Sequence, residues 1–296
     1  MKVKHYGLLL AILSPIFSSM ATIFQSGATK LLTPMFVASV GSILGAIIIF
    51  FILLSSGKLP SLKKIKENKF DLTTMTIFRF ILGVAIFAYA LSMTTGIKAI
   101  FFTKAEPYFV LLWFWLLQKG EIKKQHVALL GIHIIGAILL STGGVLEFGM
   151  GQLGDLLVII AMGFFSISYI PGKKLSTSMG SKQSNFVTMG LGGLVLLPFA
   201  LFLSPSSVWN VFSLGWTYFL AWIILFNVIG LTMWFAALKT VKGWMVSALR
   251  AVGPIAGAPL AWLLFGEMLT PMQIVGGLIV LFTSVIIAKE HLKSKI

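Results

Sequence analysis

The sequence predicts an all-α integral membrane protein in which ten transmembrane helices form two inverted repeats of five helices. Three observations predict this fold class: the composition is too apolar for a soluble domain, the apolar residues form ten long segments, and the second half of the chain repeats the first. Of the 296 residues, 58% are apolar and 10% are charged, and the mean hydropathy is +1.00. A water-soluble domain carries about 25% charged residues, so we expect the lipid bilayer as the surroundings of this chain.

Ten segments are long and apolar enough to cross a hydrocarbon core of about 30 Å as helices. They cover residues 6–26, 34–55, 73–95, 99–117, 124–142, 154–172, 184–204, 214–237, 244–264 and 270–288. The longest polar stretch between them is 56–72. That stretch is too short for a separate catalytic or nucleic-acid-binding domain, so we expect no nucleic-acid partner despite the net charge of +15.

The lysines indicate how these helices are oriented. With a cytoplasmic N-terminus, 18 lysines fall on the cytoplasmic side, and two, Lys30 and Lys98, fall on the outer side. Short cytoplasmic loops carry an excess of Lys and Arg. We therefore expect a multi-pass protein of the plasma membrane with both termini and the 56–72 loop in the cytoplasm, and with the 143–153 loop outside.

The two halves of the chain align at an offset of 146 to 147 residues. GLLLAILSPIFSS near the start of the chain aligns with GDLLVIIAMGFFS near the start of the second half. Pro107 aligns with Pro254, and the glycine–glutamate pair at 120–121 aligns with the pair at 266–267. Order and spacing therefore persist although few residues are identical.

This alignment divides the chain into two domains, residues 1–146 and 147–296, with five predicted helices each. An odd number of helices inverts the second copy in the membrane. The equivalent loops KGEIKK and FGEMLT carry three lysines and none, which also places them on opposite sides. Inverted repeats are typical of secondary transporters, which bind their solutes near the membrane midplane between the repeats.

The paired five-helix halves, each with a proline early in the fourth helix and a glycine–glutamate pair before the fifth, resemble the EamA type of the drug/metabolite transporter superfamily. The resemblance covers residues 6–143 and 150–289. It implies ten helices around a central cavity, lined mainly by the first four helices of each half, with the fifth and tenth helices more peripheral. The resemblance also implies a transporter, since the family includes exporters of amino acids and other metabolites.

The stretch FFTKAEPYFV, residues 101–110, places two opposite charges, Lys104 and Glu106, inside a predicted span. An ionisable side chain at the bilayer centre costs about 2.5–3.5 kcal/mol on insertion scales and by default marks a functional site. Two residues apart on a helix, the side chains point about 200° away from each other, so each needs a partner elsewhere. We expect both to face the central cavity.

Two further cations lie within predicted spans. Arg250 comes four residues before Pro254, much as Lys104 comes three before Pro107. Arg79 lies about two turns into the third helix, where a cavity role and snorkelling toward the lysine-rich loop are equal alternatives. Proline removes a backbone hydrogen bond and kinks a helix. The carbonyls freed at Pro107 and Pro254 can bind a ligand, and helix packing is an equal alternative explanation of both prolines.

Uncharged candidates complete the predicted substrate site. The amides of Asn227 and Gln25 can hydrogen-bond a solute, with bonding between helices as the alternative. Tyr89, Trp234 and Trp244 are the aromatic candidates for the cavity wall, with packing as an equal alternative.

Motifs of enzymes are missing from the sequence. It contains no cysteine, and it lacks HExxH, a P-loop, a nucleophile elbow and a cluster of acids for Mg²⁺. We therefore expect no enzyme, no cofactor and no metal, and no direct drive by ATP. The expected partners are a small-molecule solute, the lipid bilayer and protons.

The leading hypothesis is a secondary transporter, exporting or exchanging a small polar metabolite by alternating access. Amino acids and related zwitterions come first, because the candidate residues carry both signs of charge. Glu106 is the acid placed to couple a proton to transport. The alternatives are an organic-anion or phosphate-ester exchanger neutralised by Lys104, Arg250 and Arg79 and, from a different class, an intramembrane enzyme or a lipid scramblase.

Overall fold

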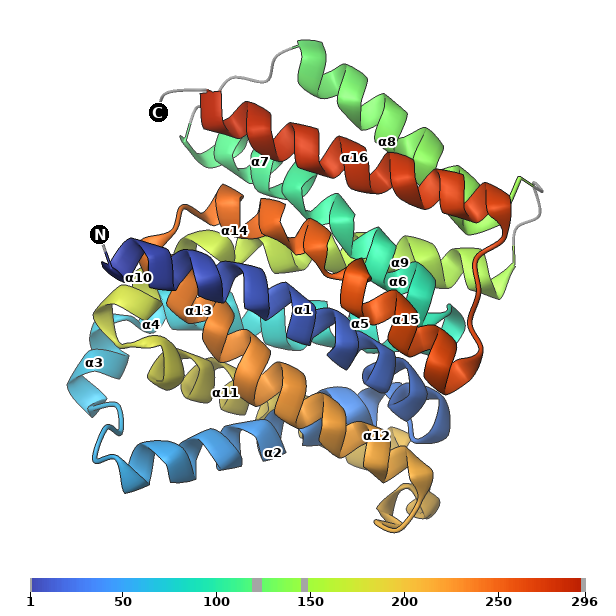
Figure 1. Ribbon diagram of the computed structural model, residues 1–296. Helices are drawn as coiled ribbons and strands as arrows, with labels where there is room; N and C mark the ends of the chain where they lie inside the picture. Colours follow the sequence, from blue (N-terminus) through green and yellow to red (C-terminus); the bar gives the residue numbers. More distant parts are fainter. Residues whose placement is uncertain (1, 119–123, 145–148, 294–296) are drawn as a thin grey trace.

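The computed structural model describes residues 2–118, 124–144 and 149–293, and every regular element in these ranges is a helix (Figure 1). The prediction of an all-α protein is thereby confirmed. Seven helices are long and apolar enough to cross a membrane: Tyr6–Leu31, Pro34–Ser55, Lys69–Met93, Met150–Ile167, Ser181–Leu203, Leu214–Thr240 and Met245–Phe265. Two shorter apolar helices cover Val127–Thr142 and Pro271–Ile286. The count of ten spans stays a prediction.

The first half of the chain forms eight helical elements and two irregular turns. They are α1 (Lys2–Leu31), α2 (Pro34–Ser55), α3 (Leu62–Glu67), α4 (Lys69–Met75), the π-helix η1 (Thr76–Gly83), α5 (Val84–Met93), α6 (Gly96–Phe102), the 3₁₀ turn η2 (Thr103–Ala105), α7 (Glu106–Gln118) and α8 (Lys124–Thr142). The run from α4 to α5 is one continuous helix that contains the π-helical segment, and α6 to α7 is a second one that contains the 3₁₀ turn.

The second half follows the same plan. It contains α9 (Met150–Ile167), α10 (Tyr169–Ser178), α11 (Ser181–Leu203), the 3₁₀ turn η3 (Ser206–Trp209), α12 (Leu214–Trp222), the π-helix η4 (Ile223–Gly230), α13 (Leu231–Thr240), α14 (Gly243–Leu249), the 3₁₀ turn η5 (Arg250–Val252), α15 (Pro254–Phe265) and α16 (Pro271–Lys293). The 3₁₀ turn η3 has no counterpart in the first half.

The irregular turns recur at a constant offset. The π-helix η4 begins 147 residues after η1, and the 3₁₀ turn η5 begins 147 residues after η2. Each of these 3₁₀ turns ends two residues before a proline in the first turn of the next helix, Pro107 or Pro254. The proline ring clashes with the carbonyl four residues earlier and fits best in a first helical turn. In Figure 1, α1 runs from left to right, whereas its counterpart α9 with α10 runs from right to left.

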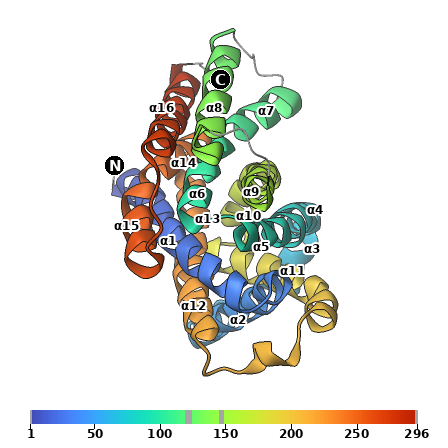
Figure 2. The same ribbon diagram turned by 90° about the vertical axis from the view of Figure 1, so that its right-hand side faces the viewer.

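Equivalent helices pack against each other at close range. The pairs are α2 with α11 and α8 with α16. Ser39 Oγ donates a 2.9 Å hydrogen bond to the Gly193 carbonyl. A Cβ on Gly193 would lie 3.0 Å from the backbone carbonyl oxygen of Ser39. Small residues at such crossings let membrane helices approach closely. Figure 2 shows α8 and α16 together at one edge of the bundle and α2 with α12 at the other, so α1, α5, α6 and α9 surround the centre.

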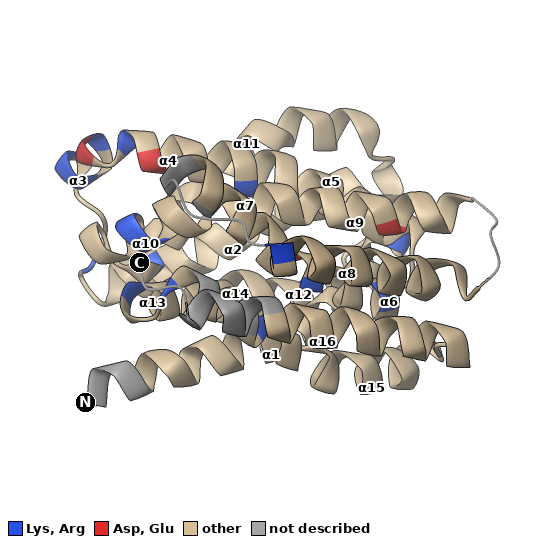
Figure 3. Ribbon diagram, turned by 90° about the horizontal axis from the view of Figure 1, so that it is seen from above, with Lys and Arg blue, Asp and Glu red and all other residues tan. Residues whose placement is uncertain are grey.

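The two ends of the bundle differ in charge. Figure 3 shows Lys and Arg gathered at the end that carries α3 and α10, which we call the lysine-rich end. The other end, where α1 ends and α6 and α9 begin, we call the opposite end; it carries Lys30 and Lys98, which pair with Glu267 and Asp155.

We expect the lysine-rich end to face the cytoplasm, and cysteine labelling of this cysteine-free chain tests it. Ser61, at the start of α3, and Gly149, before α9, are both exposed, and the φ of −137° at Gly149 suits any residue. In intact cells a membrane-impermeant maleimide should modify the Gly149→Cys variant and leave Ser61→Cys unmodified until the cells are opened. The reverse pattern would overturn the orientation.

Candidate substrate site

A small cavity lies within the bundle, where both halves meet. Its volume is about 20 Å³, enough for about one water molecule. The lining residues come from α1, η1, α5, η2, α9, α12, η4 and η5: Ser18, Thr22, Gln25, Arg79, Val84, Phe87, Thr103, Met162, Phe165, Trp222, Phe226 and Arg250. The irregular turns η1, η2, η4 and η5 therefore all contribute to its wall.

Arg79 reaches the cavity from the π-helix η1 and is 2% exposed. Its guanidinium donates a 3.0 Å hydrogen bond to Ser168 Oγ and lies 5.0 Å from the ring centre of Phe165 and 4.3 Å from that of Trp234. Cation–π contacts of this kind contribute about 0.5–2 kcal/mol each. None of the ion pairs within the described residues includes Arg79. The side chain is thus a buried cation without an acidic partner.

Arg250 reaches the cavity from the 3₁₀ turn η5 and is held by Glu106. Arg250 Nε lies 3.0 Å from Glu106 Oε2, in an ion pair that does not meet hydrogen-bond geometry. The Tyr169 hydroxyl donates a 2.8 Å hydrogen bond to the same carboxylate oxygen. Glu106 is fully buried, and its Oε1 has no hydrogen-bond partner among the described residues. Glu106 therefore serves as the counter-ion of Arg250 and is not among the residues that line the cavity.

Lys104 lies two residues before Glu106 and has a different partner. Its ammonium donates a 3.1 Å hydrogen bond to Thr103 Oγ1, and its carbonyl accepts a 2.7 Å bond from Ser284 Oγ of α16. The side chain is 2% exposed and forms no ion pair with a described residue. Thr103, which lines the cavity, thus separates Lys104 from the open space.

Of the uncharged candidates, Gln25 and Trp234 lie at the cavity or against its arginine, and Asn227 and Tyr89 do not line it. Gln25 lines the cavity from α1, and Trp234 packs against Arg79 and, edge to face at 5.2 Å, against Tyr169. Asn227 bridges two helices, because its Nδ2 donates a 2.8 Å bond to the Gly41 carbonyl of α2. Tyr89 lies half-buried in α5 and is not among the described lining residues. The side chain of Trp244, in α14, lies outside the described part of the structure.

Sequence reasoning missed three residues that shape the site. Phe165 and Ser168 hold the Arg79 guanidinium, and Tyr169 holds Glu106. The repeat offset gives a signal for two of them, because Phe165 and Tyr169 follow Ser18 and Thr22 by 147 residues, and both of those residues line the cavity. Arg250 is related to Thr103 in the same way.

The centre of the bundle therefore holds more positive than negative charge. Arg79, Lys104 and Arg250 are buried or partly buried there, and Glu106 is the acid among them. Among the described residues, no three His, Cys, Asp or Glu side chains come close enough to hold a metal ion. Chemically, the cavity offers two guanidinium groups and several hydroxyl and amide groups, which suits a small polar solute with an anionic group.

Two carboxylates join the halves at the opposite end of the bundle. Glu267 accepts hydrogen bonds from the backbone nitrogens of Gly96 at 3.2 Å and Ile97 at 2.8 Å, and it lies 3.7 Å from Lys30 Nζ. These contacts attach the loop before α16 to the first turn of α6.

Asp155 of α9 binds the same region of the first half. It accepts hydrogen bonds from Thr94 and, at 2.6 Å, from Ser141, and it lies 3.8 Å from Lys98 Nζ. We call Glu267 and Asp155 with these partners the carboxylate latch. Its contacts hold the two halves together at the opposite end.

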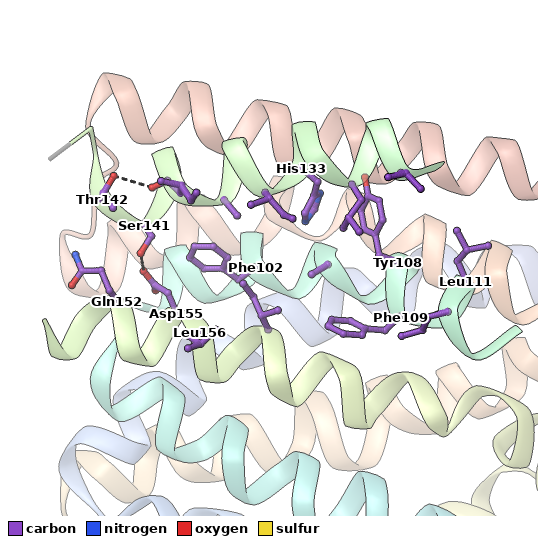
Figure 4. Close-up of a pocket in the computed structure, with 18 residues that line it drawn as sticks. Phe102, Tyr108, Phe109, Leu111, His133, Ser141, Thr142, Gln152, Asp155 and Leu156 are labelled. Carbon is purple, nitrogen blue, oxygen red and sulfur yellow. Dashed lines mark hydrogen bonds between the residues drawn. The ribbon is translucent and has the colours of Figure 1, made fainter. Parts of the chain in front are cut away.

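A separate pocket of about 630 Å³ lies among α6, α7, α8 and α9. Figure 4 shows Ser141, Thr142 and Asp155 at one end of this pocket and aromatic and aliphatic side chains along the rest. His133 in its wall is paired, because its Nδ1 lies 2.9 Å from Thr283 Oγ1 of α16. Exposed apolar side chains of α8, such as Leu130, border the pocket, so it offers an apolar surface at membrane depth.

Known proteins share both the sequence pattern and the fold. Residues 5–142 and 152–289 each match the EamA-like transporter family. An uncharacterized transporter of Methanothermobacter thermautotrophicus is 24% identical over 233 residues, which are 74% of this chain and 64% of that protein. An uncharacterized transporter of Archaeoglobus fulgidus is 26% identical over 208 residues, 68% of this chain and 70% of that protein.

The uncharacterized transporter YetK of Bacillus subtilis is 27% identical over 212 residues, 66% of this chain and 61% of that protein. The chain thus spans somewhat less than two thirds of the first and the third of these relatives. A solved crystal structure superimposes with a TM-score of 0.67 over 97% of this chain and 99% of its own, at 14% identity. At that identity the likeness shows the fold alone.

Proposed function

The chain belongs to the EamA-like transporter family, and from this premise we propose that it is a secondary transporter that moves a small polar metabolite through the central cavity by alternating access. Family membership confirms the resemblance read from the paired prolines and glycine–glutamate pairs. Family membership supports a multi-pass membrane transporter. The class of solute, the alternating-access mechanism and the coupling to protons are our proposal.

The observation that carries the proposal is the small cavity between the two halves, where two arginines and four uncharged polar side chains meet among apolar ones. Arg79 comes from the first half and Arg250 from the second, and both line the same space. The constant offset of the π-helices and 3₁₀ turns, and the opposite directions of α1 and α9, support two inverted repeats. Inverted halves can exchange roles, so a site between them can be opened to either side in turn.

Two solute classes agree with this cavity: amino acids or related zwitterions, and organic anions or phosphate esters. Both present an anionic group that a guanidinium binds with charge-assisted hydrogen bonds. A lipid scramblase needs a polar path for headgroups along the bilayer, and the pocket of Figure 4 is apolar over most of its length. The family and its relatives are transporters, which argues against an enzyme.

Ligand-dependent thermal stabilisation tests the proposal. A solute that binds the folded protein alone stabilises it by about 2.7 kcal/mol when present at a hundred times its Kd. We expect a member of one of the two classes to raise the melting temperature of the purified protein and to undergo counterflow in proteoliposomes. An export assay in whole cells then gives the direction of transport. Failure of every amino acid, organic anion and phosphate ester in both assays would contradict transport of a small polar metabolite.

Glu106 is the proposed proton-coupling residue. Protonation of its carboxylate would release Arg250 for the anionic group of the solute, so that proton and solute load together. The Glu106→Gln variant keeps the size and the hydrogen bonding of the side chain but cannot bind and release a proton. We expect it to retain counterflow and to lose accumulation driven by a pH gradient, measured with labelled solute in proteoliposomes.

A matched control is Asp71→Asn, which removes a carboxylate whose ion pair with Lys174, at 3.8 Å, is exposed. We expect this variant to accumulate solute like the parent. If Glu106→Gln concentrates solute as well as the parent and with the same pH dependence, Glu106 is a structural partner of Arg250 and some other group carries the coupling.

A further inference from the structure

We infer that the transported solute is a net anion, a small organic acid or phosphate ester without an ammonium group, whose anionic group binds between Arg79 and Arg250. This inference rests on the proposed transport function and selects between its two solute classes.

The described cavity wall carries cations and no acid. Arg79 and Arg250 are among its lining residues, whereas Glu106 is not. Arg79 has no acidic partner and is fixed between Phe165 and Trp234. Nη1 of this guanidinium bonds Ser168, and its remaining donors belong to a planar fork that matches a carboxylate or phosphate. The anionic half of a solute therefore has a well-defined place.

The ammonium group of a zwitterion lacks an equivalent place. Glu106 is 0% exposed, and its Oε2 already faces Arg250 at 3.0 Å and Tyr169 at 2.8 Å. Its Oε1 is also buried. A solute ammonium would have to displace Arg250 to reach this carboxylate, and it would then lie beside a second cation.

The remaining polar groups of the wall are neutral and carry no charge to pair with an ammonium. Thr103 Oγ1 accepts its hydrogen bond from the ammonium of Lys104 at 3.1 Å and donates to the Ile100 carbonyl. Lys104 thus already occupies a hydroxyl that an incoming ammonium could use. Thr22 donates to the Ser18 carbonyl and, like Gln25, keeps neutral acceptor atoms that suit a hydroxyl of the solute but do not compensate the charge of an ammonium.

The charge balance points the same way. Three cations and one carboxylate leave an excess of positive charge in the closed bundle, and an unpaired buried ion costs several kcal/mol. An anion reduces this excess before the cavity closes, whereas a zwitterion leaves the net charge unchanged. Alternating access must pass through a closed state with solute bound. The excess positive charge therefore stabilises that state more with an anion than with a zwitterion.

Pairs of solutes that differ in one group test the inference. Lactate and alanine share a carboxylate and a carbon chain, and differ by a hydroxyl in place of an ammonium group; 2-hydroxyglutarate and glutamate form a second pair. We expect the hydroxy acid of at least one pair, or glycerol phosphate, to bind at least ten times more tightly than either amino acid in thermal-shift titrations. The same preference should appear in counterflow by the purified protein.

A pair of variants at Ser18, which lines the cavity, sharpens the test. Ser18→Asp supplies the missing carboxylate and should shift the preference at least tenfold toward the amino acid. Ser18→Asn has nearly the same shape without the charge and should keep the preference for the anion.

The outcomes distinguish a failure of the anion inference from a failure of the proposed transport function. If amino acids bind and move as well as or better than the matched hydroxy acids and glycerol phosphate, the anion inference is overturned and the proposed transport function stands. If no solute of any class stabilises the protein or undergoes counterflow, the proposed function fails, and the inference falls with it.

Discussion

Replacing Arg79 with glutamine is expected to abolish transport while leaving the empty protein at least as stable as the parent. The guanidinium lines the cavity but has no acidic partner in the described structure. Hydrogen bonds to charged groups contribute about 1.5–3 kcal/mol each, so losing a two-bond contact to the solute predicts a loss of affinity of at least about a hundredfold. Solute titrations and counterflow measure this loss, and thermal unfolding without solute measures stability.

The stability result separates a functional cation from a structural one. Removing one partner of a buried ion pair costs about 3–5 kcal/mol, because a charge is left uncompensated. Glu106→Gln should therefore lower the melting temperature, since it leaves Arg250 without its acid. Arg79→Gln leaves Glu106 paired with Arg250. Removing a buried charge offsets the lost contacts with Phe165, Trp234 and Ser168. A large drop in melting temperature for Arg79→Gln, together with normal transport, would show that Arg79 acts in folding alone.

Arg79→Lys is the conservative control for this position. Lysine keeps the charge but lacks the planar fork and the stacking surface between Phe165 and Trp234. We expect intermediate transport, with a larger loss in affinity than in maximal rate. Full activity would mean that charge alone suffices at this place, and that the aromatic contacts add no specificity.

The two prolines show which part of the site can be predicted from sequence. Pro107 and Pro254 mark the breaks in the fourth and ninth predicted spans, because a proline excludes the hydrogen bond and the space that an intact helix needs. The structure places 3₁₀ turns directly before both. The predicted charges Lys104 and Arg250 lie on these turns, so the local pattern was sufficient to locate them.

The partners of those charges could not be predicted in the same way. Glu106 meets Arg250 from a position 144 residues away, and Tyr169 joins them from a break between α9 and α10. That break falls inside one predicted apolar span, and Pro171, three residues after Ser168, marks it in the same way. A proline does not tell which distant side chain Tyr169 will meet. The π-helix that carries Arg79 leaves no composition signal, since its residues would fit an ordinary α-helix. Long-range packing decides these features.

The carboxylate latch leads to a last expectation about how the cavity opens. Glu267 and Asp155 belong to the second half, and their side chains are 9% and 3% exposed. Both bind the segment from Thr94 to Lys98 of the first half. Opening the cavity toward this end requires these contacts to separate. The strength of the latch therefore sets how often the opposite end opens.

We expect the double variant Glu267→Gln and Asp155→Asn to open the cavity toward the opposite end. Loss of two charge-assisted attachments should shift the equilibrium by about 3 kcal/mol, or about a hundredfold in the open population. A cysteine replacing Thr22, which lines the cavity, reports this opening. An impermeant thiol reagent, applied from the side on which the Gly149→Cys variant reacts, should modify it at least ten times faster in the double variant than in the latch-intact background.

Asp71→Asn in the same Thr22→Cys background is the matched control at the lysine-rich end. Its ion pair with Lys174 is exposed, with side-chain exposures of 19% and 63%, and exposed pairs contribute about 0–1 kcal/mol. We expect no change in the labelling rate from either side. A residue that controls access at one end must change how fast the cavity is labelled from that end. An unchanged labelling rate in the double latch variant, or a faster rate from the lysine-rich side alone, would therefore show that Glu267 and Asp155 stabilise the fold without controlling access.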